Sequence, residues 1–174
     1  KITNWRKGDT TGLKDDYITC LYQDHYGRLW IGTNNNGLQY MDPKEGRIMS
    51  VATTGPISQS TICSIIGDRN GGLWISSSLG LYEYVPAKHT FVRYTIDDGL
   101  PTNQFNFSSS WMSHNGTLLL GTVHGLVTFS PSSIHHKSGP FHVHLKNLII
   151  NNCIINASSP HSPLVRELDD TSHI

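Results

Sequence analysis

The sequence lacks the features that define several common classes of protein. Its 13 basic and 13 acidic residues give a formal net charge of zero and form no long basic run, so a nucleic-acid-binding surface is not supported. No long apolar run is present, which argues against a membrane-spanning helix in these 174 residues. No secretory leader precedes the first residues, which resemble a strand, so any export signal is expected upstream.

Motifs for catalysis and cofactor binding are also missing. The sequence contains no nucleophile elbow, phosphate-binding loop, dinucleotide fingerprint or zinc-protease motif. Three pairs of adjacent aspartates could suggest glycoside hydrolysis, but each pair lies beside a turn or a link, where Asp commonly shapes the backbone. His142 and His144 would share one face of a strand, yet no Cys, Asp or Glu lies near them in sequence to complete a metal site. We therefore expect no catalytic residue, no metal and no cofactor.

Cysteine is scarce as well. The three cysteines, Cys20, Cys63 and Cys153, are an odd number without a regular spacing, which argues against a disulfide framework. When the internal repeats of the chain are aligned, Cys20 and Cys63 occupy adjacent strand positions, so their side chains would point to opposite faces. We expect buried free thiols.

A ten-residue motif recurs three times at a nearly constant spacing. It reads DHYGRLWIGT at residues 24–33 and DRNGGLWISS at residues 68–77, and a weaker copy, SHNGTLLLGT, lies at residues 113–122. Trp30 lies 44 residues before Trp74, which lies 45 residues before Leu119. A steady period in this range is typical of stacked or radial repeat proteins.

Each repeat has the composition of a small antiparallel sheet. Asp, Asn and Gly favour a tight turn, and the following Leu-Trp-Ile run suits a buried strand. A Gly-Leu pair then begins a second short strand. Four strands in about 40–45 residues match the size of one blade of a β-propeller. We therefore predict an all-β fold, a partial β-propeller of about three four-stranded blades.

The pattern also gives the expected bounds. The blades should span about residues 18–56, 62–101 and 105–130, after a partial blade at 1–17. The expected strands of the first two complete blades are 18–23, 29–33, 38–41 and 47–51, then 62–66, 73–76, 81–85 and 90–95. The last blade should lack its outer strand, because Pro131 follows it directly and proline cannot donate to a strand ladder.

The repeats resemble the regulator-propeller repeats of bacterial hybrid two-component sensors. The resemblance is carried by the Asp-x-x-Gly-x-Leu-Trp-Ile-Gly-Thr turn at residues 24–33, the Gly-Leu pairs, and the Gly-Leu-Pro link at residues 99–101. It covers roughly residues 1–134. The Trp-Asp dipeptide of WD40 blades is absent, and the turn differs from the sialidase Asp box by one extra residue.

The composition changes after residue 134. Residues 135–139 read as a polar linker, and residues 141–145 alternate apolar and polar as a strand does. Two short apolar runs flank Asn151-Asn152, a plausible two-residue hairpin turn. In the sensors that the repeats resemble, an immunoglobulin-like β-sandwich follows the last repeat. The resemblance therefore implies that residues 140–174 begin such a domain, truncated here.

The resemblance also implies a function. Such proteins sense ligands, commonly glycan fragments, on the periplasmic side of the bacterial inner membrane and signal to a histidine kinase and phosphorelay. The kinase and the membrane segment would lie C-terminal to this chain, so we expect no enzymatic activity in it. Two alternatives remain open: a sialidase-like or lyase propeller enzyme, and a protein-interaction propeller with no small ligand.

The loops suggest where a ligand could bind. In a propeller, the loop between the second and third strands lies on the same side as the link to the next blade. Here both sets of loops are rich in neutral amides, whose paired donors and acceptors suit sugar hydroxyls. The candidate ligand-binding residues are Asn34, Asn35, Asn36, Gln59, Asn103, Gln104 and His124.

The repeated tryptophans could serve as sugar platforms, but their recurrence favours a structural role. A residue that recurs at one point of every blade usually packs between blades. We therefore expect Trp30 and Trp74 to be buried between neighbouring sheets. An open arc of blades would leave sheet faces uncovered, so we also expect the chain to self-associate.

Overall fold

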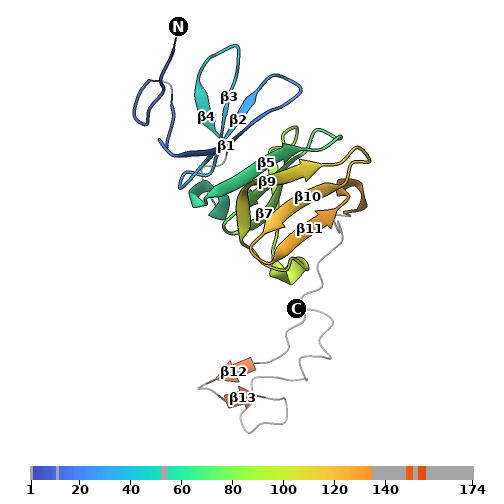
Figure 1. The fold of residues 1–174 in the computed structure, drawn as a ribbon. Helices are drawn as coiled ribbons and strands as arrows, with labels where there is room; N and C mark the ends of the chain where they lie inside the picture. The colour runs from blue at the N-terminus through green and yellow to red at the C-terminus, as the bar shows by residue number, and fades with distance from the viewer. Residues whose placement is uncertain (1, 11, 52–54, 135–147, 151–152, 156–174) are drawn as a thin grey trace. The chain divides into compact units, whose positions relative to one another are not determined.

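Three antiparallel sheets follow one another along the first part of the chain (Figure 1). The structure is a computed structural model that describes residues 2–10, 12–51, 55–134, 148–150 and 153–155. It divides the chain into two compact units, residues 1–134 and 135–174. The three sheets belong to the first unit, and the predicted all-β propeller architecture is confirmed.

The first two sheets have four strands each, in sequence order, and the third has three. The first blade comprises β1 (Ile18–Gln23), β2 (Leu29–Thr33), β3 (Leu38–Met41) and β4 (Ile48–Ser50). The second comprises β5 (Ile62–Gly67), β6 (Leu73–Ser77), β7 (Gly80–Val85) and β8 (Thr90–Tyr94). The third comprises β9 (Phe105–Met112), β10 (Leu118–Thr122) and β11 (Gly125–Phe129). Every strand expected in the first two blades forms within one residue of its expected ends.

Short 3-10 helices occupy the links. The first two are η1 (Pro56–Gln59) and η2 (Ile96–Asp98), and η3 (Pro131–Ser133) follows the third sheet. Among the described residues β11 pairs only with β10, so the third blade lacks an outer strand as predicted. Residues 2–10 form turns but no strand, contrary to the expectation for the start of the chain. No described strand lies beside them to complete a hydrogen-bonded ladder.

The three inner strands, β1, β5 and β9, lie against one another. The middle strand, β5, contacts both of its neighbours, and β1 also contacts β9. The first and third sheets of a flat stack could not touch in this way. The contact between β1 and β9 therefore means that the blades fan out around an axis lined by their inner strands, as they do in a propeller.

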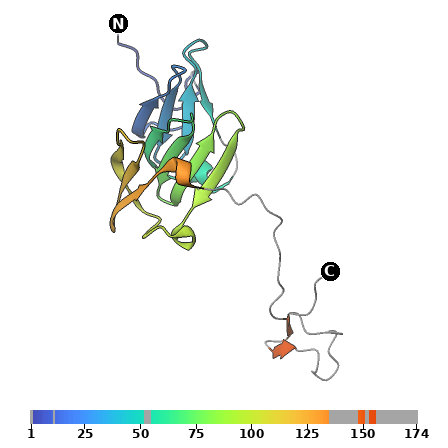
Figure 2. The ribbon, with the colours of Figure 1, turned by 90° about the vertical axis from the view of Figure 1, so that its right-hand side faces the viewer.

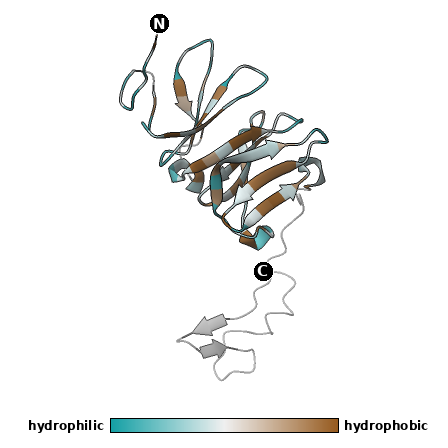
Figure 3. Ribbon diagram, in the orientation of Figure 1, coloured by the Kyte–Doolittle hydropathy of each residue, from teal (hydrophilic) through white to brown (hydrophobic). Residues whose placement is uncertain are grey.

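Hydrophobic side chains fill the two spaces between neighbouring blades. Trp30 and Leu38 of the first blade meet Ile75, Tyr82 and Tyr84 of the second. Trp74 and Leu81, on the opposite face of the second blade, meet Leu118, Leu120 and Phe129 of the third. Figure 2 shows the three sheets from a second direction, and in Figure 3 many of the apolar residues lie in the strands.

The two described thiols follow this division. Cys20 packs against the core between the first two blades, and Cys63 belongs to the core between the second and third. Both are free, as predicted. Burial raises the pKa of each to about 11, so both are protonated at neutral pH.

A repeated set of hydrogen bonds closes each blade at one end. A hydroxyl at the end of the second strand donates to the carbonyl oxygen of a glycine that begins or precedes the third strand. The three pairs are Thr33 and Gly37 at 2.8 Å, Ser77 and Gly80 at 2.9 Å, and Thr122 and Gly125 at 2.9 Å. Each hydroxyl also accepts a main-chain N–H from the loop between them. We call this arrangement the hydroxyl–glycine closure.

Backbone geometry explains the glycines of the closure. All three have positive φ, where a side chain is disfavoured. A Cβ on Gly37 would also lie 2.3 Å from the carbonyl oxygen of Ile57, and one on Gly80 would lie 2.6 Å from that of Tyr94. Gly37 and Gly80 are therefore required by close backbone packing as well as by the turn, whereas Gly125 is favoured by its positive φ alone.

The second unit contains one described hairpin. Strands β12 (Leu148–Ile150) and β13 (Cys153–Ile155) are antiparallel, with Ile150 paired to Cys153. This agrees with the expected hairpin, whose connecting residues 151–152 lie outside the described residues. The strand expected at 141–145 also lies outside them, so the immunoglobulin-like domain stays a prediction.

Candidate ligand-binding site

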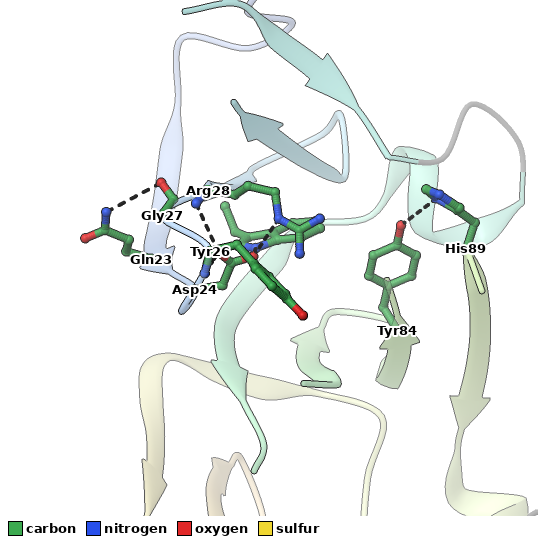
Figure 4. Close-up of polar contacts among 8 residues, drawn as sticks. Gln23, Asp24, Tyr26, Gly27, Arg28, Tyr84 and His89 are labelled. Carbon is green, nitrogen blue, oxygen red and sulfur yellow. Dashed lines mark hydrogen bonds and ion pairs between the residues drawn. The ribbon is translucent and has the colours of Figure 1, made fainter. Parts of the chain in front are cut away.

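The Asp turns lie at the other end of the blades from the hydroxyl–glycine closures. Asp24 accepts main-chain N–H bonds from Tyr26 at 2.9 Å and Arg28 at 3.0 Å through Oδ1. Its Oδ2 accepts from Nε1 of Trp30 at 2.9 Å and Nε of Arg28 at 2.7 Å, and the Arg28 contacts can be followed in Figure 4. Burial raises the pKa of Asp24, but hydrogen bonds from Trp30 and Arg28 outweigh it and hold that pKa below its ordinary value.

The second Asp turn repeats the arrangement. Asp68 accepts from the N–H groups of Asn70 at 2.8 Å and Gly72 at 2.9 Å, and from Nε1 of Trp74 at 3.0 Å. These carboxylates are fully engaged in shaping their turns and orienting the indoles. This end of the blades therefore offers few unpaired acceptors from the Asp side chains for a ligand.

The tryptophans are buried between blades, as predicted. Trp30 and Trp74 each expose only 1% of their surface. Trp30 meets Tyr84 of the next blade edge-on with ring centroids 5.7 Å apart, and Trp74 meets Phe129 edge-on at 4.7 Å. Neither indole can stack on a sugar, because both faces are covered by protein.

The amide-rich loops gather at the closure end of the blades. Three equivalent main-chain bonds connect the residue before each inner strand to the residue after the second strand. They join Tyr17 to Asn34 at 3.1 Å, Thr61 to Ser78 at 3.0 Å, and Gln104 to Val123 at 3.3 Å. The links and the β2–β3, β6–β7 and β10–β11 loops therefore share one surface, which we call the loop face.

Some candidate ligand residues on the loop face are engaged in holding the loops. The side-chain amide of Asn36 donates to Asp15 at 3.3 Å, and the side-chain oxygen of Asn103 accepts from the N–H of Ile96 at 3.0 Å. The main chain of Asn35 also donates to Asp15 at 3.0 Å. Burial raises the pKa of Asp15, but main-chain bonds from Tyr17 and Asn35 and the Asn36 amide hold it below its ordinary value.

The other candidates are more available. Asn35, Gln59, Gln104 and His124 are exposed. Within the described residues their side chains make no recorded hydrogen bond to the protein. Asn34 is half-buried, and its side-chain oxygen accepts from the hydroxyl of Thr61 at 3.4 Å. The loop face thus combines fixed amides that shape the backbone with exposed side chains that a ligand could reach.

Sequence reasoning missed an irregularity in the inner strand of the third blade. Tyr22 lies four positions after Ile18 in β1, but Trp111 lies six positions after Phe105 in β9, although both pairs face equivalent positions on the second strand. The β1 and β5 strands each have a one-residue bulge near their start, whereas β9 carries two residues more at this level. The added length is visible in the sequence as the longer separation between Phe105 and the turn at Ser113.

The longer bulge brings a ring towards the axis. Ser108, within the bulge, has φ of 52°, a conformation uncommon for serine. The neighbouring Phe107 is 56% exposed. Phe107 and the start of β1 line an open cleft of about 400 Å³, formed by Asp16, Tyr17, Ile18, Thr19 and Phe107, which we call the axial cleft.

No metal-binding arrangement emerges from the described part of the chain, where three or more His, Cys, Asp or Glu side chains do not gather. His142 and His144 lie outside that part. The described residues also contain no helix both long and apolar enough to cross a bilayer.

Blades of four antiparallel strands around an axis define a β-propeller, and the comparisons with known proteins specify its kind. The family described as two component regulator propeller matches residues 12–35, from the first link to the β2–β3 loop. The match agrees with the resemblance of the repeats to regulator-propeller repeats, and it covers one of them. A curated relative, Histidine kinase P4 of Formosa agariphila, is 32% identical over 78 residues, which are 45% of this chain and 6% of the relative.

Two solved structures have a similar fold. The chain is similar to an extracellular domain assigned to a hybrid two component system of B. thetaiotaomicron, with a TM-score of 0.61 and 25% identity over 67% of this chain and 16% of that one. A second extracellular domain of the same bacterium shares the fold, with a TM-score of 0.58 and 20% identity over 91% of this chain and 19% of that one. The chain therefore spans less than a fifth of the length of these relatives.

Proposed function

We propose that this chain is part of the extracytoplasmic sensor region of a hybrid histidine kinase. In this proposal the parent protein is anchored in the bacterial inner membrane and the propeller lies on its periplasmic side. Ligand binding would be relayed across the membrane to a kinase and phosphorelay. The observation that carries the proposal is the regulator-propeller repeat, in a chain similar to a histidine kinase and to an extracellular two-component domain.

A glycan fragment is the proposed ligand. The loop face carries neutral amide side chains in exposed positions, and these offer the paired donors and acceptors that sugar hydroxyls require. The loops are held on a rigid scaffold by the hydroxyl–glycine closures, so the amides would be presented with little loss of conformational freedom on binding.

The distribution of arginine argues against a sialidase-like or lyase enzyme. Such an enzyme would need Arg, Tyr and carboxylate groups converging at the axis. Arg28 is paired with its own Asp turn, and Arg93 donates to a main-chain carbonyl at 2.9 Å. Arg69 likewise donates to a main-chain carbonyl, and Arg47 directly precedes β4. None of these four lines the axial cleft.

The test is to follow both binding and signalling in the intact parent protein. Calorimetry of its extracytoplasmic region with a panel of oligosaccharides should identify a ligand. The same ligand should change autophosphorylation of the full-length kinase in membrane vesicles, while oligosaccharides that do not bind should leave it unchanged. Failure of every oligosaccharide to bind, together with capture of a protein by the same region, would favour the interaction propeller instead.

A further inference from the structure

The axial cleft forms where β9 departs from the repeated structure of the inner strands. The inner strands β1 and β5 each contain a bulge of one extra residue, so each stays close to its own sheet. In β9 the two further residues push the backbone out of the sheet, and Ser108 adopts a left-handed conformation there. Bulges of this kind commonly re-aim a side chain near a functional site.

The re-aimed side chain is an aromatic ring facing other accessible groups. Phe107 is 56% exposed and Tyr17, at the start of β1, is 64% exposed. Two large aromatic rings exposed to water on one open cleft are unusual, because such rings are mostly buried in folded proteins. Binding of a ligand would remove their apolar surface from water. The same cleft carries the hydroxyl of Thr19 and the carboxylate of Asp16, whose Oδ1 accepts the N–H of Lys7 at 2.6 Å and whose Oδ2 could accept from a ligand.

The charge of the cleft narrows the class of ligand. Asp16 is the charged residue among the five that line the cleft, and no Lys or Arg is among them. Lys7 lies beside both carboxylates: its main-chain N–H donates to Oδ1 of Asp16 at 2.6 Å and its charge acts on Asp15, but Lys7 does not line the cleft. An anionic ligand in the cleft would therefore contact a carboxylate and no cation of the lining, which is unfavourable. A neutral ligand with one apolar face and several hydroxyls would meet no such penalty.

The cleft also joins the loop face. Asp16 follows Asp15, which receives the main chain of Asn35 and the side chain of Asn36. The β2–β3 loop is thereby fixed beside the cleft. A ligand larger than one ring could lie in the cleft and extend over the exposed side chain of Asn35.

We infer that the axial cleft is a subsite for one residue of a neutral oligosaccharide, with the apolar face of the sugar on Phe107 and Tyr17 and its hydroxyls towards Asp16 and Thr19. This subsite rests on the proposed sensor function and specifies where the ligand is held and what charge it carries. Uronic and sulfated sugars are disfavoured by the same geometry.

Calorimetry on the 174-residue chain and on the intact extracytoplasmic region, with matched sets of neutral, uronic and sulfated oligosaccharides, tests the inference. A neutral sugar should bind, and Phe107→Ala should weaken its binding at least about tenfold. Deletion of Phe107 and Ser108 restores the strand length of β1 and β5, so the variant should keep its thermal midpoint while losing the ligand. Tyr26→Ala is the matched control, since Tyr26 is 70% exposed but lies in the Asp turn, and it should bind as the wild type does.

The calorimetry results distinguish an error in the subsite from an error in the proposed glycan-sensor function. Binding of a neutral sugar that is insensitive to Phe107→Ala and to the deletion would overturn the subsite and leave the glycan sensor standing. Preference for a uronic or sulfated sugar would overturn the neutral specificity in the same way. If no sugar binds the intact region at all, the glycan sensor itself is wrong, and the subsite falls with it.

Discussion

The Asp turns of the first two blades and the corresponding turn of the third are built differently. In the first two, one carboxylate holds both the turn and the indole of a buried tryptophan. In the third, Ser113 replaces Asp and Leu119 replaces Trp. The Ser113 hydroxyl still closes its turn, with bonds of 3.0 Å to the N–H and the carbonyl oxygen of Thr117.

The difference between these turns indicates that the Asp and the Trp depend on each other, because the indole N–H donates to the carboxylate. A buried indole N–H without an acceptor would cost about 1–3 kcal/mol, and a carboxylate that loses its donors would also be destabilised. Replacing both together avoids both penalties. The tryptophans face the next blade, whereas Leu119 is half-buried on a face that no other described sheet covers. A large indole would bury less surface there.

Truncation of a buried tryptophan should give the largest difference in stability between the second turn and the third. Trp74→Ala removes the ring that packs against Phe129 and Tyr94, and it should lower the free energy of unfolding by about 3–5 kcal/mol. Leu119→Ala, at the equivalent position on the uncovered face, should cost clearly less. Urea denaturation followed by circular dichroism measures both, and equal losses would show that the third turn is as deeply packed as the second.

Removal of the turn carboxylate should have the next largest effect. Asp68→Ala leaves two main-chain N–H groups and the Trp74 indole without their acceptor, so we expect a loss of about 2–3 kcal/mol. Ser113→Ala should cost only about 1 kcal/mol, because its neutral hydroxyl bonds Thr117 and Asn115 within the turn and no buried indole depends on it. The double variant Asp68→Ala with Trp74→Phe should recover part of the loss, since the indole N–H that needed Asp68 is gone.

Acid should weaken the first turn through Asp24. Its folded pKa lies below the ordinary value of 3.8, so its contribution is present at neutral pH and is lost as pH falls below about 4. The difference in unfolding free energy between wild type and Asp24→Ala should therefore be constant from pH 7 to 5 and shrink on further acidification. A difference that grows as pH falls would mean that the folded pKa is raised instead.

The uncovered face of the third blade should govern association while contributing little to stability. Trp111 is 66% exposed and Leu126 is 62% exposed on this blade. We expect the chain to form oligomers, and Trp111→Ser to shift it towards monomer in light scattering while changing stability by less than about 0.5 kcal/mol. Tyr26→Ser is the matched control, as an equally exposed ring at the Asp turn of the first blade. A wild type that stays monomeric at high concentration would contradict the expectation.

Sequence periodicity predicted the strands and the buried tryptophans because both are set by local, repeated chemistry. The Gly and Asp positions fix each turn, and in the first two blades the tryptophan between them faces the neighbouring sheet. The hydrogen bond between the Asn36 side chain and Asp15 was not predictable in the same way, because the two residues are 21 positions apart and lie in different loops. The sequence shows the longer bulge of β9 as two extra residues before the third turn. It does not show at which residues of the strand the bulge forms.

The hydroxyl–glycine closure has a consequence for how this fold can diversify. It fixes both ends of a loop whose length differs between blades: three residues separate Thr33 from Gly37, whereas two separate Ser77 from Gly80 and Thr122 from Gly125. The same anchor therefore accepts different loops without moving the strands beneath. Mutation can remodel the loops one blade at a time, so new recognition surfaces can evolve on an unchanged scaffold, and loops could be exchanged between blades as cassettes.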